Sequence, residues 1–396
     1  MERLFLKKII TAIIFIIMIF TLFFINLKNI YTPLLKENFT SSSLISSLEN
    51  ITGNNIYEET ILLELRSYFN KLIYRNEDSN FEIIKDKNGS LSYNYSAPQN
   101  PAIKNFVKNI KALKDKLKNK TTKFAYIMPL DKSVKNYFTP DDGIPYKSAN
   151  GTANTFLKFL NSNNIATIDL RKNLNKSGIS NSNLFFKTDE HEKIGTSFFE
   201  FTQLVNILKT KYNLNLDNNN FFTNKNNYNF ITYKNSFLGS IGAKTGIAYS
   251  GTDDFTLIYP KYETNYECTF KTENGQFITK GRFEDSLLNI PTLRSNNNIY
   301  STDTNKYSTY LFGNQNIVHI VNKNNPTGPK ILFINDSFLT PTAAFLSTVC
   351  SEVYLVDFEH YSGNIADFEN SVKTDFVFVS FAPENLTEDF FKGLAK

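Results

Sequence analysis

The sequence of 396 residues contains no tryptophan, only two cysteines and only three histidines. Cys268 and Cys350 are too few for a framework of disulfides, and Cys350 lies in an apolar helical pattern where a buried thiol is expected. The histidines belong to no Cys/His cluster with zinc spacing, so neither a metal site nor a cofactor is predicted. The net charge of +5 is spread along the chain without a long basic run, which argues against a nucleic-acid partner.

The one long hydrophobic run lies near the amino terminus, where residues 9–27 are uncharged and rich in isoleucine and phenylalanine. Nineteen helical residues span roughly 28 Å, close to the hydrocarbon core of a bilayer. Arg3, Lys7 and Lys8 precede the run, so residues 1–8 are predicted to be cytoplasmic and everything after the anchor extracellular. A cleaved signal peptide is the alternative, although no small-x-small cleavage site follows the run.

The rest of the chain divides into two parts. Residues 28–100 are mixed and polar, with one amphipathic stretch over 56–73, and are interpreted as a spacer with a helical lead-in. From residue 101 to 396, predicted strands alternate with predicted helices, which favours an α/β domain with a parallel sheet and flanking helices. The region of about 210–300 is rich in asparagine and in short alternating runs, which predicts a β-rich insertion.

A candidate nucleophile follows one of the predicted strands. Four apolar residues, Ile331–Ile334, end at Asn335-Asp336-Ser337, and Pro341 then fits the first turn of a helix running to Cys350. A serine at such a turn lies at the carboxyl edge of the sheet, where α/β folds bind ligands, and near a helix amino terminus that favours developing negative charge. Asp336-Ser337 is also an ordinary helix cap, and both readings fit the pattern.

A candidate base lies upstream, in Lys187-Thr188-Asp189-Glu190-His191. A carboxylate two residues from an imidazole can orient it only if both lie in the turn before the next helix, because that spacing in a helix points them apart. The pair Asp189 and Glu192 also fits a capping box, so a structural role stays open.

Four segments in this order resemble the alginate-acetyltransferase-like, or DHHW, family of SGNH-hydrolase-like proteins. The segments are Lys187–His191, Phe237-Leu238-Gly239-Ser240 with Lys244-Thr245-Gly246, Tyr310-Leu311-Phe312-Gly313-Asn314, and Ile334–Phe338 continuing to Tyr354-Leu355-Val356-Asp357. The resemblance covers roughly residues 122–386. It departs from the family pattern at Glu190, where a histidine usually stands, and at Glu192, which replaces a tryptophan.

The resemblance implies a polysaccharide O-acetyltransferase with an SGNH-like fold, anchored in the cell membrane by a single segment with its catalytic domain outside. It assigns the triad to Asp189, His191 and Ser337, and it makes Gly313 and Asn314 candidates for oxyanion or substrate contacts. The implied partners are a polysaccharide acceptor and a multi-spanning membrane O-acyltransferase that supplies acetyl groups. No cofactor is implied.

Two other functions fit the same residues. A carbohydrate acetyl esterase would use the same triad with water in place of the sugar hydroxyl. A non-catalytic surface protein that binds glycans would carry a degenerate site, and Glu190 and Glu192 are the residues that keep this possibility open.

Overall fold

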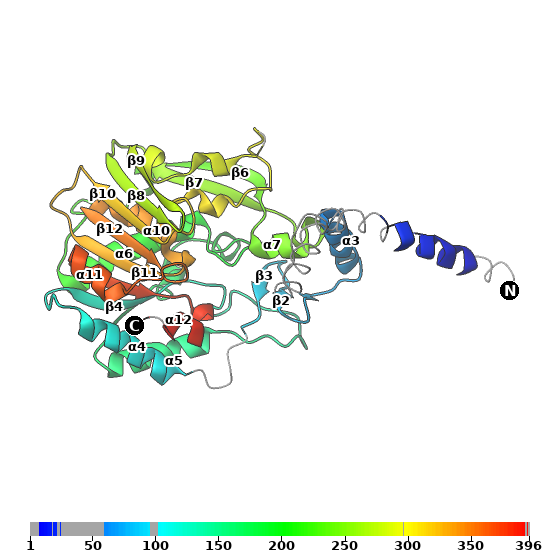
Figure 1. Cartoon of the computed structure of the whole chain (residues 1–396), viewed down its shortest axis with the longest axis horizontal. Coiled ribbons are helices and arrows are strands. Elements are labelled where there is room, and N and C mark those ends of the chain that lie inside the picture. Colours follow the sequence, from blue (N-terminus) through cyan, green and yellow to red (C-terminus); the bar gives the residue numbers. More distant parts are fainter. Residues whose placement is uncertain are drawn as a thin grey trace, which may run out of the picture. The chain divides into compact units, whose positions relative to one another are not determined.

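The structure is a computed structural model that describes residues 8–17, 19–21, 24, 59–95, 102–295, 297–392 and 394. It divides into two units, residues 1–69 and 70–396 (Figure 1). In the first unit, residues 8–17 and 19–21 are helical. A further helix, α3 (Glu59–Leu72), begins in the first unit and ends in the second. This helix lies within the predicted amphipathic stretch.

The predicted membrane anchor is only partly described, because residues 18, 22, 23 and 25–27 lie outside the described residues. Within the parts of the chain that are described, no helix combines the length and the apolar character that a membrane crossing requires. The anchor over 9–27 therefore stays a prediction.

The second unit is built on an eight-stranded sheet. Its strands are, in spatial order, β5 (Ala166–Asp169), β4 (Lys123–Met128), β13 (Phe376–Ser380), β11 (Lys330–Asn335), β12 (Glu352–Asp357), β10 (Ile317–Asn322), β8 (Tyr266–Thr272) and β9 (Gly275–Gly281). The strands from β5 to β12 pair in parallel, and β10, β8 and β9 continue the sheet in antiparallel pairs. The predicted α/β class is confirmed, and the parallel sheet is extended on one side by antiparallel strands.

Helices cover the sheet on both faces (Figure 1). The helices that follow α3 are α4 (Ile103–Lys116), α5 (Asn150–Ser162), α6 (Ile194–Tyr212), α7 (Ser240–Thr245), α8 (Ile247–Ser250), α9 (Phe283–Ser286), α10 (Thr340–Leu346), α11 (Ile365–Val372) and α12 (Glu388–Lys392). Of these, α7 and α8 pack on Ile83 and Leu91, outside the eight-stranded sheet. Single 3₁₀ turns accompany them, among them η1 (Leu174–Lys176), η5 (Lys306–Thr309), η6 (Ser337–Leu339), η7 (Ser347–Val349) and η8 (Pro383–Asn385).

The central strand β11 shows why the sheet lies between two layers of helices. Its residues 331–334 are completely buried, and they alternate between two hydrophobic cores. Ile331 and Phe333 pack in the core with α6 and α10, whereas Leu332 and Ile334 pack in the core with α4 and α5. Successive side chains of a strand point to opposite faces, so an unbroken apolar run is needed between two helical layers. Burying each such side chain contributes about 2 kcal/mol.

The asparagine-rich region contains two kinds of structure. β6 (Tyr228–Phe237) and β7 (Asp253–Pro260) pair with each other as a separate antiparallel ribbon. β8 and β9 instead join the main sheet through β10. The predicted antiparallel strands are observed, but only the β6–β7 ribbon stands apart from the main sheet.

Three short strands that the sequence did not predict precede the main domain. They are β1 (Glu77–Asp78), β2 (Ile83–Lys85) and β3 (Leu91–Tyr93), and they form one antiparallel sheet. The backbone N–H of Leu91 donates to the carbonyl of Lys187 at 2.8 Å. This small sheet thereby supports the loop that carries the candidate base.

Candidate active site

The candidate nucleophile lies where β11 ends at the carboxyl edge of the sheet. Asp336 has an extended backbone, and its side chain accepts the N–H of Phe338 at 3.1 Å, which starts η6 at Ser337. α10 follows directly with Pro341 in its first turn. Asp336 is thus a helix cap, and the cap itself holds Ser337 at the end of the strand, so the two readings of Asp336-Ser337 are compatible.

Asp336 also ties this turn to the neighbouring strand. Its carboxylate accepts the backbone N–H of Ala382 at 2.6 Å and the side-chain amide of Asn385 at 2.9 Å, both beyond the end of β13. Burial raises the pKa of Asp336 to about 6. Asp336 therefore fixes the serine turn against the residues that follow β13.

The candidate base lies in the turn before α6. The N-cap of this helix is Lys193, and Asp189 makes no cap, so the capping-box interpretation of Asp189 and Glu192 is wrong. The backbone N–H of Phe186 donates to the carbonyl of His191 at 3.2 Å and closes the loop between them. The Asp189 and His191 side chains are therefore free of helical geometry and can face each other.

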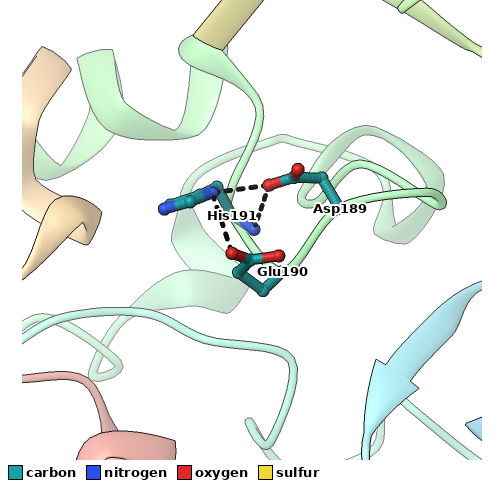
Figure 2. A group of neighbouring side chains, drawn as sticks. All are labelled: Asp189, Glu190 and His191. Atoms are coloured by element: carbon teal, nitrogen blue, oxygen red, sulfur yellow. Dashed lines mark hydrogen bonds and ion pairs between the residues drawn. The ribbon is translucent and has the colours of Figure 1, made fainter. Parts of the chain in front are cut away.

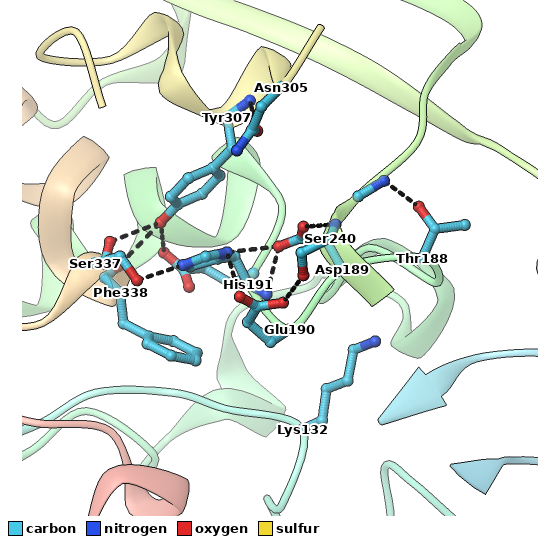
Figure 3. A network of polar contacts seen from close by, with 12 residues as sticks. Lys132, Thr188, Asp189, Glu190, His191, Ser240, Asn305, Tyr307, Ser337 and Phe338 are labelled. Atoms are coloured by element: carbon cyan, nitrogen blue, oxygen red, sulfur yellow. Dashed lines mark hydrogen bonds and ion pairs between the residues drawn. The ribbon is translucent and has the colours of Figure 1, made fainter. Parts of the chain in front are cut away.

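One continuous hydrogen-bonded chain joins Asp189, His191 and Ser337 (Figure 3). Figure 2 shows its Asp189–His191 part together with Glu190. His191 Nδ1 lies 2.5 Å from Asp189 Oδ1, and His191 Nε2 lies 2.7 Å from Ser337 Oγ. All three residues are buried or half-buried. The structure therefore brings together an imidazole and a hydroxyl that are 146 residues apart in the chain.

Charges around the imidazole favour its protonated form. Burial alone would lower the pKa of His191, but Asp189, assisted by Glu190 and Glu192, raises it to about 10. Burial likewise opposes ionisation of Asp189, yet His191 and backbone N–H donors lower the pKa of that carboxyl to about 2. The site thus stabilises an ion pair, the state that arises when the imidazole takes a proton from Ser337.

The segment Phe237–Ser240 holds the carboxylate in place. The backbone N–H of Ser240 donates to Asp189 Oδ2 at 2.7 Å, and the N–H of Gly239 donates to Thr188 Oγ1 at 2.9 Å (Figure 3). A Cβ on Gly239 would lie 2.2 Å from Cβ of Asp189, so only glycine allows this approach. The close approach of this segment to Asp189 therefore explains why position 239 is a glycine.

Tyr307 was not predicted as a site residue. Its ring stacks on the His191 imidazole with centroids 4.0 Å apart and planes at 21° (Figure 3). Its hydroxyl donates to the carbonyls of Ser337 and Phe338, both at 3.3 Å, and lies 3.4 Å from Glu192 Oε1. Nothing in the pattern around Tyr307 marks it, apart from its place three residues before the Tyr310–Asn314 segment.

The two glutamates that depart from the family pattern both line the site. Glu192 is completely buried, accepts from Ser197 Oγ at 2.8 Å, and has its pKa raised to about 7 by burial. Glu190 accepts a hydrogen bond from Ser240 Oγ and lies 3.9 Å from His191 Nδ1. Both carboxyls add negative potential behind the imidazole without interrupting the Asp189–His191 contact.

Lys132 is a buried cation close to these acids (Figure 3). Its ammonium donates to the carbonyl of Leu91 in β3, and at 3.4 Å to that of Lys187. Burial lowers the pKa of Lys132 to about 8, although Asp253, Asp189 and Glu190 oppose the shift. The side chain therefore links the small sheet to the loop of the candidate base.

Gly313 and Asn314 lie at a small cavity beside the serine turn. Asn335, Asp336 and Thr340 line the same cavity. Gly313 has φ of +74°, a left-handed conformation that favours glycine. Their roles as oxyanion or substrate contacts stay predictions.

The other two histidines have local partners. His319 Nε2 lies 2.9 Å from Glu352 Oε2, and its ring stacks on Tyr354 at 4.1 Å, which agrees with a structural role. His360 Nδ1 lies 2.9 Å from Asp357 Oδ2, and 43 % of the His360 side chain is exposed.

Two groups of side chains in the described residues are close enough to share a metal ion: Asp189 with Glu190 and His191, and Asp357 with Glu359 and His360. In the first group, both ring nitrogens of His191 already face Asp189 and Ser337. In the second, Glu359 and His360 are exposed. In the first group, hydrogen bonds therefore already engage the only imidazole.

Comparison with solved structures identifies the fold. PatB1 of Bacillus cereus, solved with a sulfonyl adduct, aligns over 78% of this chain and 97% of its own, with 18% identity and a TM-score of 0.61. A DHHW family protein from Eubacterium siraeum aligns over 79% of this chain and 96% of its own, with 16% identity and a TM-score of 0.55. No protein-family model and no curated protein matches the sequence. The likeness predicted from the motifs is thus confirmed at the level of the fold.

Proposed function

We propose that this chain, which shares the fold of PatB1 and of a DHHW family protein, is a polysaccharide O-acetyltransferase that works through an acetyl-serine intermediate. The hydrogen-bonded chain from Asp189 through His191 to Ser337 is the observation that carries this proposal. It is the arrangement that activates a serine hydroxyl for acyl transfer. The same arrangement serves both halves of a double displacement.

In the first half-reaction, His191 Nε2 takes the proton of Ser337 Oγ as that oxygen attacks the acetyl carbonyl of the donor. The tetrahedral intermediate collapses, the bond to the donor's leaving group breaks, and the imidazolium gives its proton to that group. Asp189 stabilises the imidazolium meanwhile. Ser337 is left acetylated.

In the second half-reaction, a sugar hydroxyl loses its proton to His191 Nε2 and attacks the acetyl carbon. The bond to Ser337 Oγ breaks, and the serine recovers its proton from the imidazolium. The products are an O-acetylated sugar and the free enzyme, and over both halves the reaction consumes only the acetyl donor and the acceptor hydroxyl.

The oxyanion of each intermediate needs hydrogen-bond donors. The backbone N–H of Ser337 is the first of η6, and N–H groups at the start of a helical turn have no carbonyl partner within it. The Asn314 side chain, at the adjoining cavity, is the proposed second donor. One such donor is typically worth about 100-fold to 1,000-fold in rate.

The proposed setting is the outer face of the cell membrane. Residues 9–27 anchor the chain, residues 1–8 stay inside, and the catalytic domain acts on an extracellular or cell-surface polysaccharide. A multi-spanning membrane O-acyltransferase would deliver acetyl groups to Ser337. Because the acetyl group crosses the membrane through the partner, no soluble cofactor is needed outside.

A competing function is acetyl ester hydrolysis by the same three residues, and one experiment separates the two. The full-length chain is incubated with an activated acetyl ester, with and without an oligosaccharide acceptor. Acetylated oligosaccharide that depends on Ser337 supports the transferase, whereas acetate release unaffected by acceptor identifies an esterase. PatB1 forms a sulfonyl adduct, so a sulfonyl reagent offers a parallel test for a reactive residue in this chain.

A further inference from the structure

A polar cavity of about 630 Å³ lies at the carboxyl end of β5, and its lining does not include Asp189, His191 or Ser337. Its size lies within the range of pockets that hold organic ligands. The polar and charged side chains that matter in its lining are Lys135, Asn150, Asn154, Asp169, Arg171 and Lys172. None of them takes part in the proposed acyl transfer.

The cavity opens on the same edge of the sheet as Ser337. β5 and β11 are parallel strands with β4 and β13 between them, so their carboxyl ends share one edge. Three strand spacings separate them, roughly 14 Å. A polymer bound at Ser337 that continued along this edge would reach the cavity within a few sugar residues.

Arg171 organises the floor of the cavity. Only 7% of its side chain is exposed, and it lies against Asp169, with Nε 2.8 Å from Oδ1. Its two remaining nitrogens donate to the side-chain oxygens of Asn150 at 2.7 Å and Asn154 at 2.8 Å. The guanidinium therefore fixes two amide groups that line the cavity.

This arrangement sets the direction of both amides. A guanidinium can only donate hydrogen bonds, so the amide atom that faces it must be the oxygen. The NH₂ groups of Asn150 and Asn154, two residues that line the cavity, are then left as donors that a ligand can use. Sugar hydroxyls and carboxylates are suitable acceptors for such donors.

The charge of the lining favours an anion. Arg171 and Asp169 neutralise each other, whereas Lys135 and Lys172 add two positive charges at the exposed rim. A neutral sugar would use the amides but not these lysines. An acidic sugar would use both.

We propose that this cavity is a subsite for an acidic glycan, which holds the acceptor polysaccharide a few sugar residues away from the one acetylated at Ser337. Binding of a glycan is inferred from the lining of the cavity alone, whereas its link to acetylation rests on the proposed function. Binding at the subsite positions the polymer and takes no part in the chemistry.

The test is binding of a hexasaccharide of galacturonic acid to the full-length chain in detergent, measured by titration calorimetry. Asn154→Asp keeps an oxygen for Arg171 but replaces the NH₂ donors with a charged acceptor, and we expect it to weaken binding at least about tenfold. Lys135→Gln with Lys172→Gln should weaken binding similarly and reduce its salt dependence. Lys176→Gln, four residues from Lys172 and exposed, is the matched control and should bind as the wild type.

Hydrolysis of an activated acetyl ester is measured on the same variants. Unchanged hydrolysis with weakened hexasaccharide binding supports the subsite. Wild-type binding in Asn154→Asp, or equally strong binding of hexaglutamate or of a neutral galactose hexasaccharide, would overturn it. Loss of ester hydrolysis in the wild type would count against the proposed acyl transfer and leave the binding result to be judged separately.

Discussion

At the scale of single residues, His191 sets the pH dependence of the proposed reaction. A general base must be neutral to accept a proton, and Asp189 raises the pKa of His191 to about 10 by favouring the imidazolium. Acyl transfer in the wild type should therefore keep rising with pH well above 6.5, the ordinary pKa of histidine. The measurement is kcat/KM for an activated acetyl ester between about pH 5 and 10, corrected with Ser337→Ala.

Asp189→Asn tests the cause of that shift. A neutral amide no longer favours the imidazolium, so the acid limb of the pH profile should move to lower pH while kcat falls by roughly 10,000-fold. Glu190→Gln removes a more distant charge and should move the limb in the same direction by less, with most activity kept. An acid limb that stays in place in Asp189→Asn would contradict the assignment of Asp189.

Tyr307 is expected to position the imidazole against the serine. Tyr307→Phe keeps the ring on His191 but removes the hydroxyl that bonds the carbonyls of Ser337 and Phe338, so kcat/KM should fall about tenfold. Tyr307→Ala removes the stacking as well and should cost more. Circular dichroism and thermal unfolding are the controls for folding, and equal activity of all three proteins would exclude this role.

At the scale of elements, the turn between β6 and α7 is expected to hold Asp189 through Gly239. Gly239→Ala places a Cβ 2.2 Å from that of Asp189, so the carboxylate must move and activity should fall at least about tenfold. Gly195→Ala, in the first turn of α6 with open space around it, is the matched control and should stabilise the helix by about 0.5 to 1 kcal/mol without loss of activity. Activity assays and thermal unfolding of both variants decide the question.

The elements that the sequence predicted are those with a strong local pattern. β11 follows from an unbroken apolar run, and α4 from apolar residues recurring every three or four positions between lysines. The helix after Ser337 was expected to reach Cys350, but α10 ends at Leu346 and the chain continues as η7. Residues 340–350 are all buried, so their burial pattern cannot distinguish an α-helix from a 3₁₀ turn.

Elements with weak local patterns were missed. β1, β2 and β3 have two or three residues each, too few to show the alternation of a strand. Tyr307 is defined by its contact with His191, which is 116 positions away and leaves no periodic signal. By contrast, the proximity of His191 and Ser337 could be predicted from the resemblance to the DHHW family, which assigns both residues to one triad although they are 146 positions apart.

At the scale of the whole molecule, we expect a membrane-anchored enzyme. The full-length chain should sediment with membranes and resist a high-salt wash, because salt screens ionic contacts but does not weaken the burial of apolar side chains that an anchor over residues 9–27 would provide. A chain that lacks residues 1–27 but is given a cleavable export signal should appear in the medium. Recovery of the full-length chain in the soluble fraction would contradict the anchor.

Acetylation of Ser337 is the central step of the proposed mechanism, and mass spectrometry tests it directly. The full-length chain is mixed with an activated acetyl ester, quenched in acid, digested, and the peptide containing Ser337 is examined. We expect one acetyl group on Ser337 in the wild type, none in Ser337→Ala, and little in His191→Ala. Two results would contradict the proposed mechanism. One is cleavage of the ester in a single turnover without acetylated Ser337, and the other is full acetylation of Ser337 in His191→Ala.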